Sequence, residues 1–272
     1  MDLGLRDKVV WITGASGGIG RALAETFAHS GFEALAAWLA EQPWRERALA
    51  QRADVRDAAA LERCAAQIRA HFGRIDVCAA NAGKWPSEHR ELHELEPARL
   101  LDTLATNLHG ALFTARAFLG VLRQSGPRAD GHGAALVFTG STAGRFGERG
   151  HVDYAVAKAA LVGAVKTLKN EIVRLDPYGR VNLVEPGWTV THMARPALAQ
   201  PGVVERVTRT MALRQLARAR DIARTVAFLA SPTAASHISG ETLTVAGGME
   251  GRLLWDEHEV EHGRILGRLE RD

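Results

Sequence analysis

The sequence predicts an α/β protein with a Rossmann-type fold: a doubly wound parallel sheet of about seven strands with helices on both faces, in a single domain. Three observations support this prediction. Short apolar segments rich in β-branched residues alternate with longer segments of helical composition. A glycine-rich turn follows the first of the short segments. The chain has 272 residues, 46% of them hydrophobic, and can therefore bury one large core.

The elements follow one another in regular alternation. Residues 8–13 form the first predicted strand, and the turn after it leads into a helix that ends near His29. In chain order, we then expect strands at 33–39 and within 48–55, a helix at 57–72, a strand at 75–80, a helix at 97–124, a strand at 133–140, a helix at 152–175, a strand at 180–186, a helix at 219–230 and a strand at 241–247. Because helices separate most of the strands, right-handed crossovers would make the sheet parallel.

One domain accounts for most of the chain. We expect residues 1–248 to form a catalytic and dinucleotide-binding domain. Within it, the irregular, arginine-rich segment 192–218 would close over a substrate as a lid. Residues 249–272 follow the last strand as a charged C-terminal extension.

Charge and cysteine content exclude several classes of protein. The net charge is only +3 and the arginines are scattered, unlike the basic face of a nucleic-acid-binding protein. Cys64 and Cys78 are too few for a disulfide framework and lack the spacing of a metal site. The N-terminus lacks the pattern of a signal peptide, and no apolar run approaches the ~20 residues that span a bilayer. We therefore expect a cytoplasmic protein with no metal ion, nucleic-acid partner or membrane partner.

The segment TGASGGIGR at 13–21 joins the first strand to the first helix. Gly14, Gly18 and Gly20 allow the backbone to turn tightly and to approach a ligand. The helix N-terminus then offers unpaired N–H groups and a positive dipole end to a pyrophosphate. A glycine-rich turn can be purely structural, but its place after the first strand of an α/β chain favours a dinucleotide site.

The segment YAVAK places Tyr154 and Lys158 four residues apart in a predicted helix, and therefore on one face of it. Such residues can be a half-buried surface pair. They can also be a tuned acid, because a nearby ammonium group favours the phenolate and lowers the pKa of a tyrosine from about 10.

Together these motifs resemble those of the short-chain dehydrogenase/reductase family. The G-x-x-x-G-x-G spacing of the glycine-rich turn, NAG at 81–83, the Y-x-x-x-K pair and PGWTVT at 186–191 each match a motif of that family. Ser141 lies 13 residues before the motif tyrosine, within the family's usual range, and Asn107 stands where the family has a helix asparagine. The matches occur in the family's order along nearly the whole predicted domain.

The resemblance implies an NAD(P)-dependent oxidoreductase that transfers hydride between a nicotinamide cofactor and a carbonyl or secondary alcohol substrate. Tyr154 would be the acid/base, and Ser141 would hydrogen-bond the same reacting oxygen. Lys158 would lower the tyrosine pKa and bind the nicotinamide ribose. Asn107 would hold a water in a proton relay to that lysine. These four are the expected catalytic residues.

The same resemblance implies the cofactor contacts. Trp38 stands where NAD-preferring members carry an acid that repels a 2′-phosphate. Since that acid is missing and Arg45 or Arg47 could reach the site, we expect NAD or NADP, with a slight preference for NADP. For Asp54, an N-cap or turn role before the helix at 57 is the alternative. The expected cofactor-binding residues are Gly14, Ser16, Gly18, Ile19, Gly20, Trp38, Asp54, Val55, Asn81, Ala82, Gly83, Tyr154, Lys158, Pro186, Gly187, Thr189 and Thr191.

The expected substrate contacts are Ser141, Arg145, Tyr154 and Trp188. Aromatic walls with basic groups would suit a ring or acyl substrate that bears an anionic group. Alternatively, the charges are merely solvated and the tryptophans anchor loops on the core. Further residues of the same loops are Lys84, Trp85, Phe146 and Met193.

Two other functions stay open: a dinucleotide-binding regulator without turnover, and a dehydratase or epimerase of the family's extended branch. Such regulators commonly lack the tyrosine or the lysine. The extended branch has a G-x-x-G-x-x-G turn and a substantial C-terminal domain.

The predicted helices at 97–124 and 152–175 carry apolar residues on more than one side. A helix that lies on a sheet needs only one apolar stripe. The broader bands, and the resemblance, imply a homodimer or homotetramer.

Overall fold

The structure, a computed structural model, describes residues 3–27, 45–249 and 251. The strand expected at 33–39, with Trp38, lies outside the described residues, as do residues 252–272 of the C-terminal extension. The limits of the domain and of the lid stay predictions.

The main sheet has five parallel strands in the described part of the chain, in the order β1-β2-β3-β4-β7. Every residue of β2, β3 and β4 is buried, as expected of a parallel sheet covered on both faces. A parallel Rossmann-type sheet is therefore confirmed. The strands are β1 (Val10–Ile12), β2 (Val77–Ala80), β3 (Ala135–Thr139), β4 (Arg180–Pro186) and β7 (Thr242–Val245).

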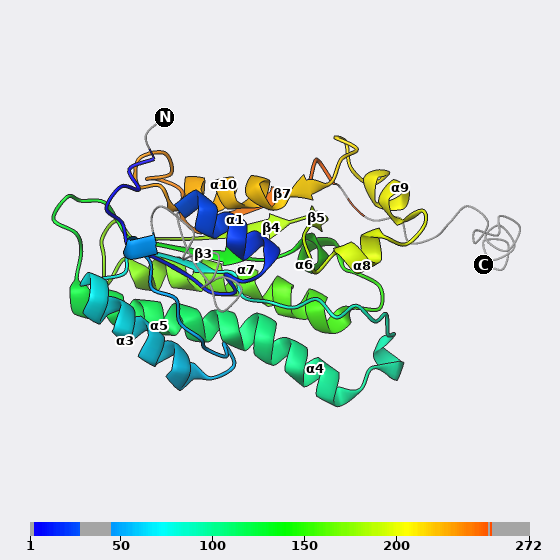
Figure 1. Ribbon diagram of the computed structural model, residues 1–272, viewed down its shortest axis with the longest axis horizontal. Coiled ribbons are helices and arrows are strands. Elements are labelled where there is room, and N and C mark those ends of the chain that lie inside the picture. The colour runs from blue at the N-terminus through cyan, green and yellow to red at the C-terminus, as the bar shows by residue number, and fades with distance from the viewer. Residues whose placement is uncertain (1–2, 28–44, 250, 252–272) are drawn as a thin grey trace, which may run out of the picture.

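Helices cover both faces of this sheet (Figure 1). The helix pair α1 and α10 lies on one face, and α3, α5 and α7 lie on the other. Their bounds are α1 (Gly18–Phe27), α3 (Ala58–Phe72), α5 (Gly110–Ser125), α7 (Val152–Ile172) and α10 (Ala219–Ala230).

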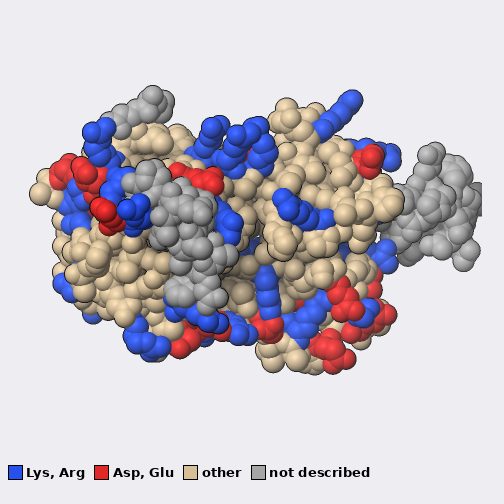
Figure 2. All heavy atoms as spheres, viewed as in Figure 1, with Lys and Arg blue, Asp and Glu red and all other residues tan. Residues whose placement is uncertain are grey.

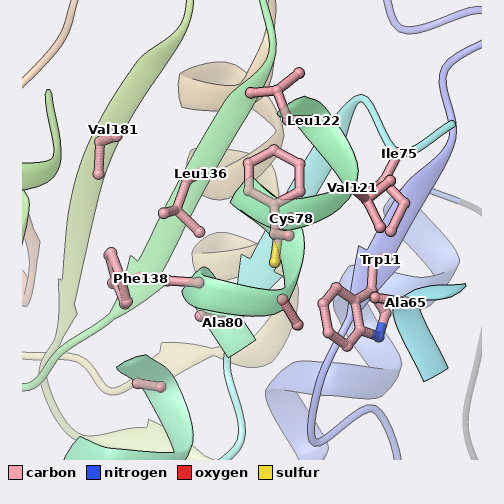
Figure 3. Close-up of a cluster of buried hydrophobic side chains, with 14 of the residues drawn as sticks. Trp11, Ala65, Ile75, Cys78, Ala80, Val121, Leu122, Leu136, Phe138 and Val181 are labelled. Atoms are coloured by element: carbon pink, nitrogen blue, oxygen red, sulfur yellow. The ribbon is translucent and has the colours of Figure 1, made fainter. Parts of the chain in front are cut away.

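Alternate strand residues supply the two cores. Ile12 and Val137 point into the core beneath α1 and α10, whereas their neighbours Trp11 and Phe138 point into the other. Figure 3 shows this second core, in which Leu136 and Phe138 lie on one side of Cys78 and Trp11 lies on the other. Both layers hold the strand ends in a fixed arrangement, and the functional side chains follow those ends.

No strand forms within residues 48–55, so the prediction of a short third strand there is wrong. A single 3₁₀ turn, η1 (Arg45–Arg47), precedes the segment. Most of its residues are alanine or polar and have low strand propensity. Only Ala53 and Val55 pack against the core.

The helix predicted at 97–124 is confirmed in its extent, but it is not uniform. It consists of α4 (Pro97–Leu104), a π-helical turn (Ala105–His109) and α5. Asn107 lies within the π turn and is fully buried. A π turn adds a residue to the local helical repeat and often marks a functional site.

The segment 192–218 folds over one end of the sheet, beyond β4 (Figure 1). It contains two short helices, α8 (Arg195–Leu198) and α9 (Val203–Thr208), and ends in β6 (Ala217–Arg218), which pairs with β5 (Thr189–Val190). Val203, Val207 and Met211 of this segment form a small third core together with Ala246 and Met249.

Positive and negative side chains are interspersed over the face shown in Figure 2, particularly along its lower edge. Exposed ion pairs of the structure include Arg56–Asp54 and Arg116–Glu62. Among the described residues, no helix is both long enough and apolar enough to cross a membrane.

Candidate active site

A cavity of about 900 Å³ opens at the carboxyl ends of the sheet strands. This is the edge at which open α/β sheets bind ligands. Some of the predicted site residues do not line this cavity: Asp54, Val55, Ala82 and Arg145. The predicted site residues that do line it are Gly14, Ser16, Gly18, Ile19, Gly20, Asn81, Gly83, Asn107, Ser141, Tyr154, Lys158, Pro186, Gly187, Trp188, Thr189 and Thr191.

Close backbone contacts shape the glycine-rich turn. Gly14 has φ +66°, and a Cβ atom there would lie 2.5 Å from the Cα atom of Ala82. A Cβ atom on Gly18 would lie 2.8 Å from the side chain of Thr191. The turn therefore requires glycine at both positions, and it leads directly into the N-terminus of α1.

Arg21, in the first turn of α1, also lines the cavity. Its Nε atom is buried without a hydrogen-bond partner in the described part of the chain. A buried donor without an acceptor is costly, and an anionic ligand would supply the acceptor. The turn, the helix N-terminus and this donor fit the pyrophosphate of a dinucleotide.

Asn107 holds the loop after β2 through both ends of its amide. Its Oδ1 atom accepts from the backbone N–H of Lys84 at 3.1 Å, and its Nδ2 atom donates to the Lys84 carbonyl at 2.9 Å. A Cβ atom on Gly83 would lie 2.7 Å from Asn107 Oδ1 and 3.3 Å from Lys158 Nζ. Asn107 and Lys158 thus converge on Gly83.

Lys158 is a buried cation, only 4% exposed. Its Nζ atom donates to the carbonyl oxygen of Thr139 at 2.8 Å, and it forms no ion pair with a carboxylate within the described ranges. Burial lowers the pKa of Lys158 to about 8. The ammonium has three donors, so two remain for a ligand or for a neighbouring side chain.

Tyr154 and Ser141 line the cavity on the side of Lys158. The ammonium of Lys158 lies 5.8 Å from the centre of the Tyr154 ring. Ser141 caps α6 (Thr142–Phe146), where its Oγ atom accepts from the N–H of Ala143 at 3.1 Å. The Ser141 hydroxyl can still donate its proton to an oxygen in the cavity.

Asp153, next to Tyr154, ties α7 to α4. It is fully buried, and its carboxylate accepts from Arg99 Nε at 3.0 Å and from the Thr103 hydroxyl at 2.9 Å. Burial opposes ionisation, but these hydrogen bonds outweigh it and hold the pKa of Asp153 below its ordinary value. Because the Thr103 carbonyl also accepts from Asn107 Nδ2 at 3.1 Å, this network joins the helix of Tyr154 to the turn of Asn107.

We expect Asp153→Ala to lower the free energy of unfolding by about 3 kcal/mol, because it leaves a mostly buried Arg99 without its carboxylate. Glu91→Ala, which breaks the exposed Glu91–Arg149 pair, is the matched control and should lower the free energy of unfolding much less, because solvent screens this pair. Urea denaturation of both variants checks the difference. Equal losses would show that the Asp153 network does not stabilise the fold.

The comparisons with known proteins agree with one another. A family model described as enoyl-(acyl carrier protein) reductase matches residues 14–250. The 3-oxoacyl-[acyl-carrier-protein] reductase FabG of Escherichia coli is 34% identical over 252 residues, which cover 89% of this chain and 97% of that protein. The chain belongs to the short-chain dehydrogenase/reductase family.

Other short-chain dehydrogenases/reductases match over similar lengths. Acetoacetyl-CoA reductase of Synechocystis is 31% identical over 91% of this chain and 98% of its own length. L-rhamnose 1-dehydrogenase (NAD(P)(+)) of Azotobacter vinelandii is 33% identical over 90% of this chain and 97% of its own. A solved structure from Brucella melitensis, described as a short-chain dehydrogenase/reductase, glucose/ribitol dehydrogenase, has a TM-score of 0.80 at 30% identity and covers 92% of this chain and 99% of that one.

As a short-chain dehydrogenase/reductase, the protein is an NAD(P)-dependent oxidoreductase that acts on carbonyl or alcohol groups. This confirms the function predicted from the sequence. The roles of individual site residues stay predictions.

Arg145 and Asp54, predicted to contact the substrate and the cofactor, have partners within the protein. Arg145 does not line the cavity. Its Nη1 atom lies 3.6 Å from Oε2 of Glu185. Asp54 accepts from the backbone N–H of Arg56 at 2.9 Å and from its guanidinium, an interaction that holds the pKa of Asp54 below its ordinary value. Asp57, not Asp54, is the N-cap of α3, where it accepts from Ala60 N at 3.1 Å.

Sequence analysis missed the roles of Glu185 and Asp153. Glu185 is buried at the end of β4 and accepts from the Thr244 hydroxyl at 3.0 Å. A carboxylate next to the apolar run Leu183–Val184 at the end of a fully buried strand is the signal that could have marked it. For Asp153 the signal is an acid at the start of a helix, which is usually an exposed position.

Proposed function

We propose that this enzyme interconverts a ketone and the corresponding secondary alcohol, with Tyr154 as the acid/base. The observation that carries the proposal is the buried ammonium of Lys158, which has no carboxylate partner in the described part of the chain and lies beside Tyr154. A positive charge held there favours the phenolate form of the tyrosine. Ser141, Asn107 and the glycine-rich turn complete the same cavity.

When bound, the nicotinamide cofactor supplies or accepts the hydride. In the reducing direction, the Tyr154 hydroxyl donates its proton to the substrate oxygen as negative charge develops there. The Ser141 hydroxyl donates a hydrogen bond to the same oxygen and orients it. Lys158 stabilises the resulting phenolate and offers its remaining donor to the ribose. Asn107 keeps the loop after Gly83 in place beside them.

The cofactor-binding residues fit a dinucleotide along the cavity. The glycine-rich turn, α1 and Arg21 would hold the pyrophosphate, and the strand ends with Asn81 and Gly83 would hold the central part. A slight preference for NADP stays our proposal, based on the missing acid at Trp38.

A panel of ketones and secondary alcohols, assayed with NADH, NADPH and their oxidised forms in parallel, tests the proposed function. We expect cofactor fluorescence to change with time for at least one carbonyl substrate. Quenching on binding without any turnover over the panel would favour the alternative of a dinucleotide-binding regulator.

Cofactor affinity should fall above pH 8. In the free enzyme, Lys158 loses its proton near that pH, because burial lowers its pKa to about 8. Oxygen acceptors of a bound cofactor favour the charged ammonium of Lys158. Above pH 8, Lys158 must therefore take up a proton when the cofactor binds, and this proton uptake weakens binding. The dissociation constant should therefore rise by up to about tenfold per pH unit above pH 8. Fluorescence titrations from pH 7 to 9.5 measure it, and Lys158→Met should show weak, pH-independent binding. A flat profile for the wild type would contradict the role of the lysine.

We propose a homotetramer or homodimer built on α4, α5 and α7. Leu101 on α4 is 66% exposed and Val156 on α7 is 51% exposed, whereas Leu161 and Val165 of α7 are fully buried in the core. The exposed apolar residues thus lie on the faces of these helices that do not contact the sheet, and a second subunit would cover them.

Leu101→Glu should lower both assembly and activity, because the subunit contact would support α7 and Tyr154. Sedimentation at micromolar concentration measures assembly, and Leu92→Glu, exposed outside these helices, is the control. A wild-type protein that is fully active as a 29.4 kDa monomer would contradict the proposal.

The cytoplasm is the proposed location. Cys64 and Cys78 are both buried free thiols, as suits a reducing compartment. Fractionation of the source cells tests the assignment.

A further inference from the structure

The substrate side of the cavity has an aromatic corner. The rings of Trp85 and Trp188 meet with centroids 6.2 Å apart and planes at 68°. Behind Trp85, the His151 imidazole stacks at 4.7 Å with an interplanar angle of 21°. Both tryptophans line the cavity together with Tyr154 and Met193. Two indoles at this angle offer one ring face and one ring edge to a bound molecule.

Contacts on both sides hold this corner in place. His151 is buried, and its ring nitrogens lie 3.0 Å from the Pro86 carbonyl and 3.2 Å from the Arg149 carbonyl. Trp188 packs against the small core of the segment that follows it, with Phe146 and Leu216. The corner is therefore preformed, and a ligand does not have to order it.

Lys84 and Arg145, two basic side chains near this corner, are paired with carboxylates, whereas Lys158 beside Tyr154 has no carboxylate partner in the described part of the chain. Lys84 forms an ion pair with Asp102, and Arg145 lies 3.6 Å from Glu185. Two arginines line the cavity itself. Arg21 belongs to α1, and Arg195 lies in the segment after Thr191, whose side chain lies against Gly18 of the glycine-rich turn. That is the phosphate side of the cavity.

Glu148 lines the cavity between α6 and α7, three residues before His151. Its backbone carbonyl accepts from the His151 N–H at 3.0 Å. Its carboxylate forms no ion pair or hydrogen bond within the described ranges. A carboxylate here repels an anionic substrate and accepts hydrogen bonds from hydroxyl groups.

From this arrangement, and on the basis of the proposed function, we infer that the substrate is an uncharged ring that carries hydroxyl groups. The C–H face of the ring packs on the indole face that this corner presents, because the π face of an indole is negative. A hydroxyl next to the reacting carbon donates to Glu148. An acyl thioester brings no ring for the indoles and no hydroxyl for Glu148, and is disfavoured. A cationic substrate is disfavoured by Lys158, which has no carboxylate partner in the described part of the chain, and by Arg21 and Arg195 of the same cavity.

Matched alcohols test the inference with NAD⁺ and NADP⁺. We would measure kcat/KM for trans-1,2-cyclohexanediol, myo-inositol and a pyranose sugar, for cyclohexanol, and for 2-butanol. Acetoacetyl-CoA with NADPH is the acyl thioester substrate. For the wild type, kcat/KM for at least one hydroxylated ring should exceed that for cyclohexanol by about tenfold or more. It should exceed kcat/KM for the thioester by a larger factor.

Two variants separate the carboxylate from the aromatic corner. Glu148→Gln should lower kcat/KM about tenfold for the hydroxylated ring and less than threefold for cyclohexanol. Trp85→Leu should lower kcat/KM for both rings relative to 2-butanol. Glu88→Gln, which changes an exposed acid outside the cavity, is the matched control and should act like the wild type.

A preference for the thioester, or equal losses for both rings in Glu148→Gln, would overturn the inference and leave the proposed function intact. Absence of turnover for every substrate would overturn the proposed function, and the inference with it.

Discussion

Tyr154→Phe should lower kcat by at least about 10³-fold for whichever substrate the enzyme turns over, while the dissociation constant of the dinucleotide changes less than threefold. A positioned general acid/base contributes about 10² to 10⁴ to a rate, and phenylalanine removes only the hydroxyl that moves the proton. The ring that packs beside Lys158 remains, so the cofactor site should stay intact.

The chain's other tyrosine offers a matched control. Tyr178 is 65% exposed and lies outside the cavity, so Tyr178→Phe should retain wild-type kcat. Steady-state kinetics and fluorescence titration of both variants give the two parameters. If Tyr154→Phe kept more than a tenth of the wild-type rate, Tyr154 would not be the acid/base.

Lys158→Ala should damage both catalysis and cofactor binding. Its ammonium stabilises the phenolate and would donate to the ribose, so one substitution removes two interactions. We expect kcat to fall by about 10² or more and the dinucleotide dissociation constant to rise by about tenfold, as for the loss of one charge-assisted hydrogen bond. Steady-state kinetics measures kcat, and fluorescence titration measures the dissociation constant of the dinucleotide.

Lys169, three turns farther along α7 and outside the cavity, is the control. Lys169→Ala should leave both parameters within about threefold of the wild type. An unchanged dissociation constant in Lys158→Ala would argue against a contact between Lys158 and the ribose. Its role would then be limited to the tyrosine.

The elements with strong local signals could be predicted from the sequence. β4 and α10 have the bounds predicted from the sequence, and the glycine-rich turn is recognisable from its spacing. The segment 48–55 was misassigned because two apolar residues in an alanine-rich stretch look like an alternating strand. Its real constraint is the packing of Ala53 and Val55 against the core beneath α3 and α5, which the local sequence does not contain.

The candidate site could be predicted where its residues belong to compact motifs. The π turn that buries Asn107 could not, because the register of a long helix depends on its packing partners. Nor could the pairing of Arg145 with Glu185, since these residues are forty positions apart and meet only through the sheet. Long-range contacts of this kind decide which basic groups remain available to a substrate.

Transfer of deuterium from the reduced cofactor to the substrate tests the central claim most directly. A carbonyl compound that the panel identifies as a substrate would be incubated with cofactor deuterated at the reactive C4 position, with wild-type enzyme and with Tyr154→Phe. We predict that the wild type yields alcohol with deuterium on the carbinol carbon and that Tyr154→Phe yields almost none, although both bind the cofactor equally well. Alcohol without deuterium, or equal transfer by both proteins, would contradict the account.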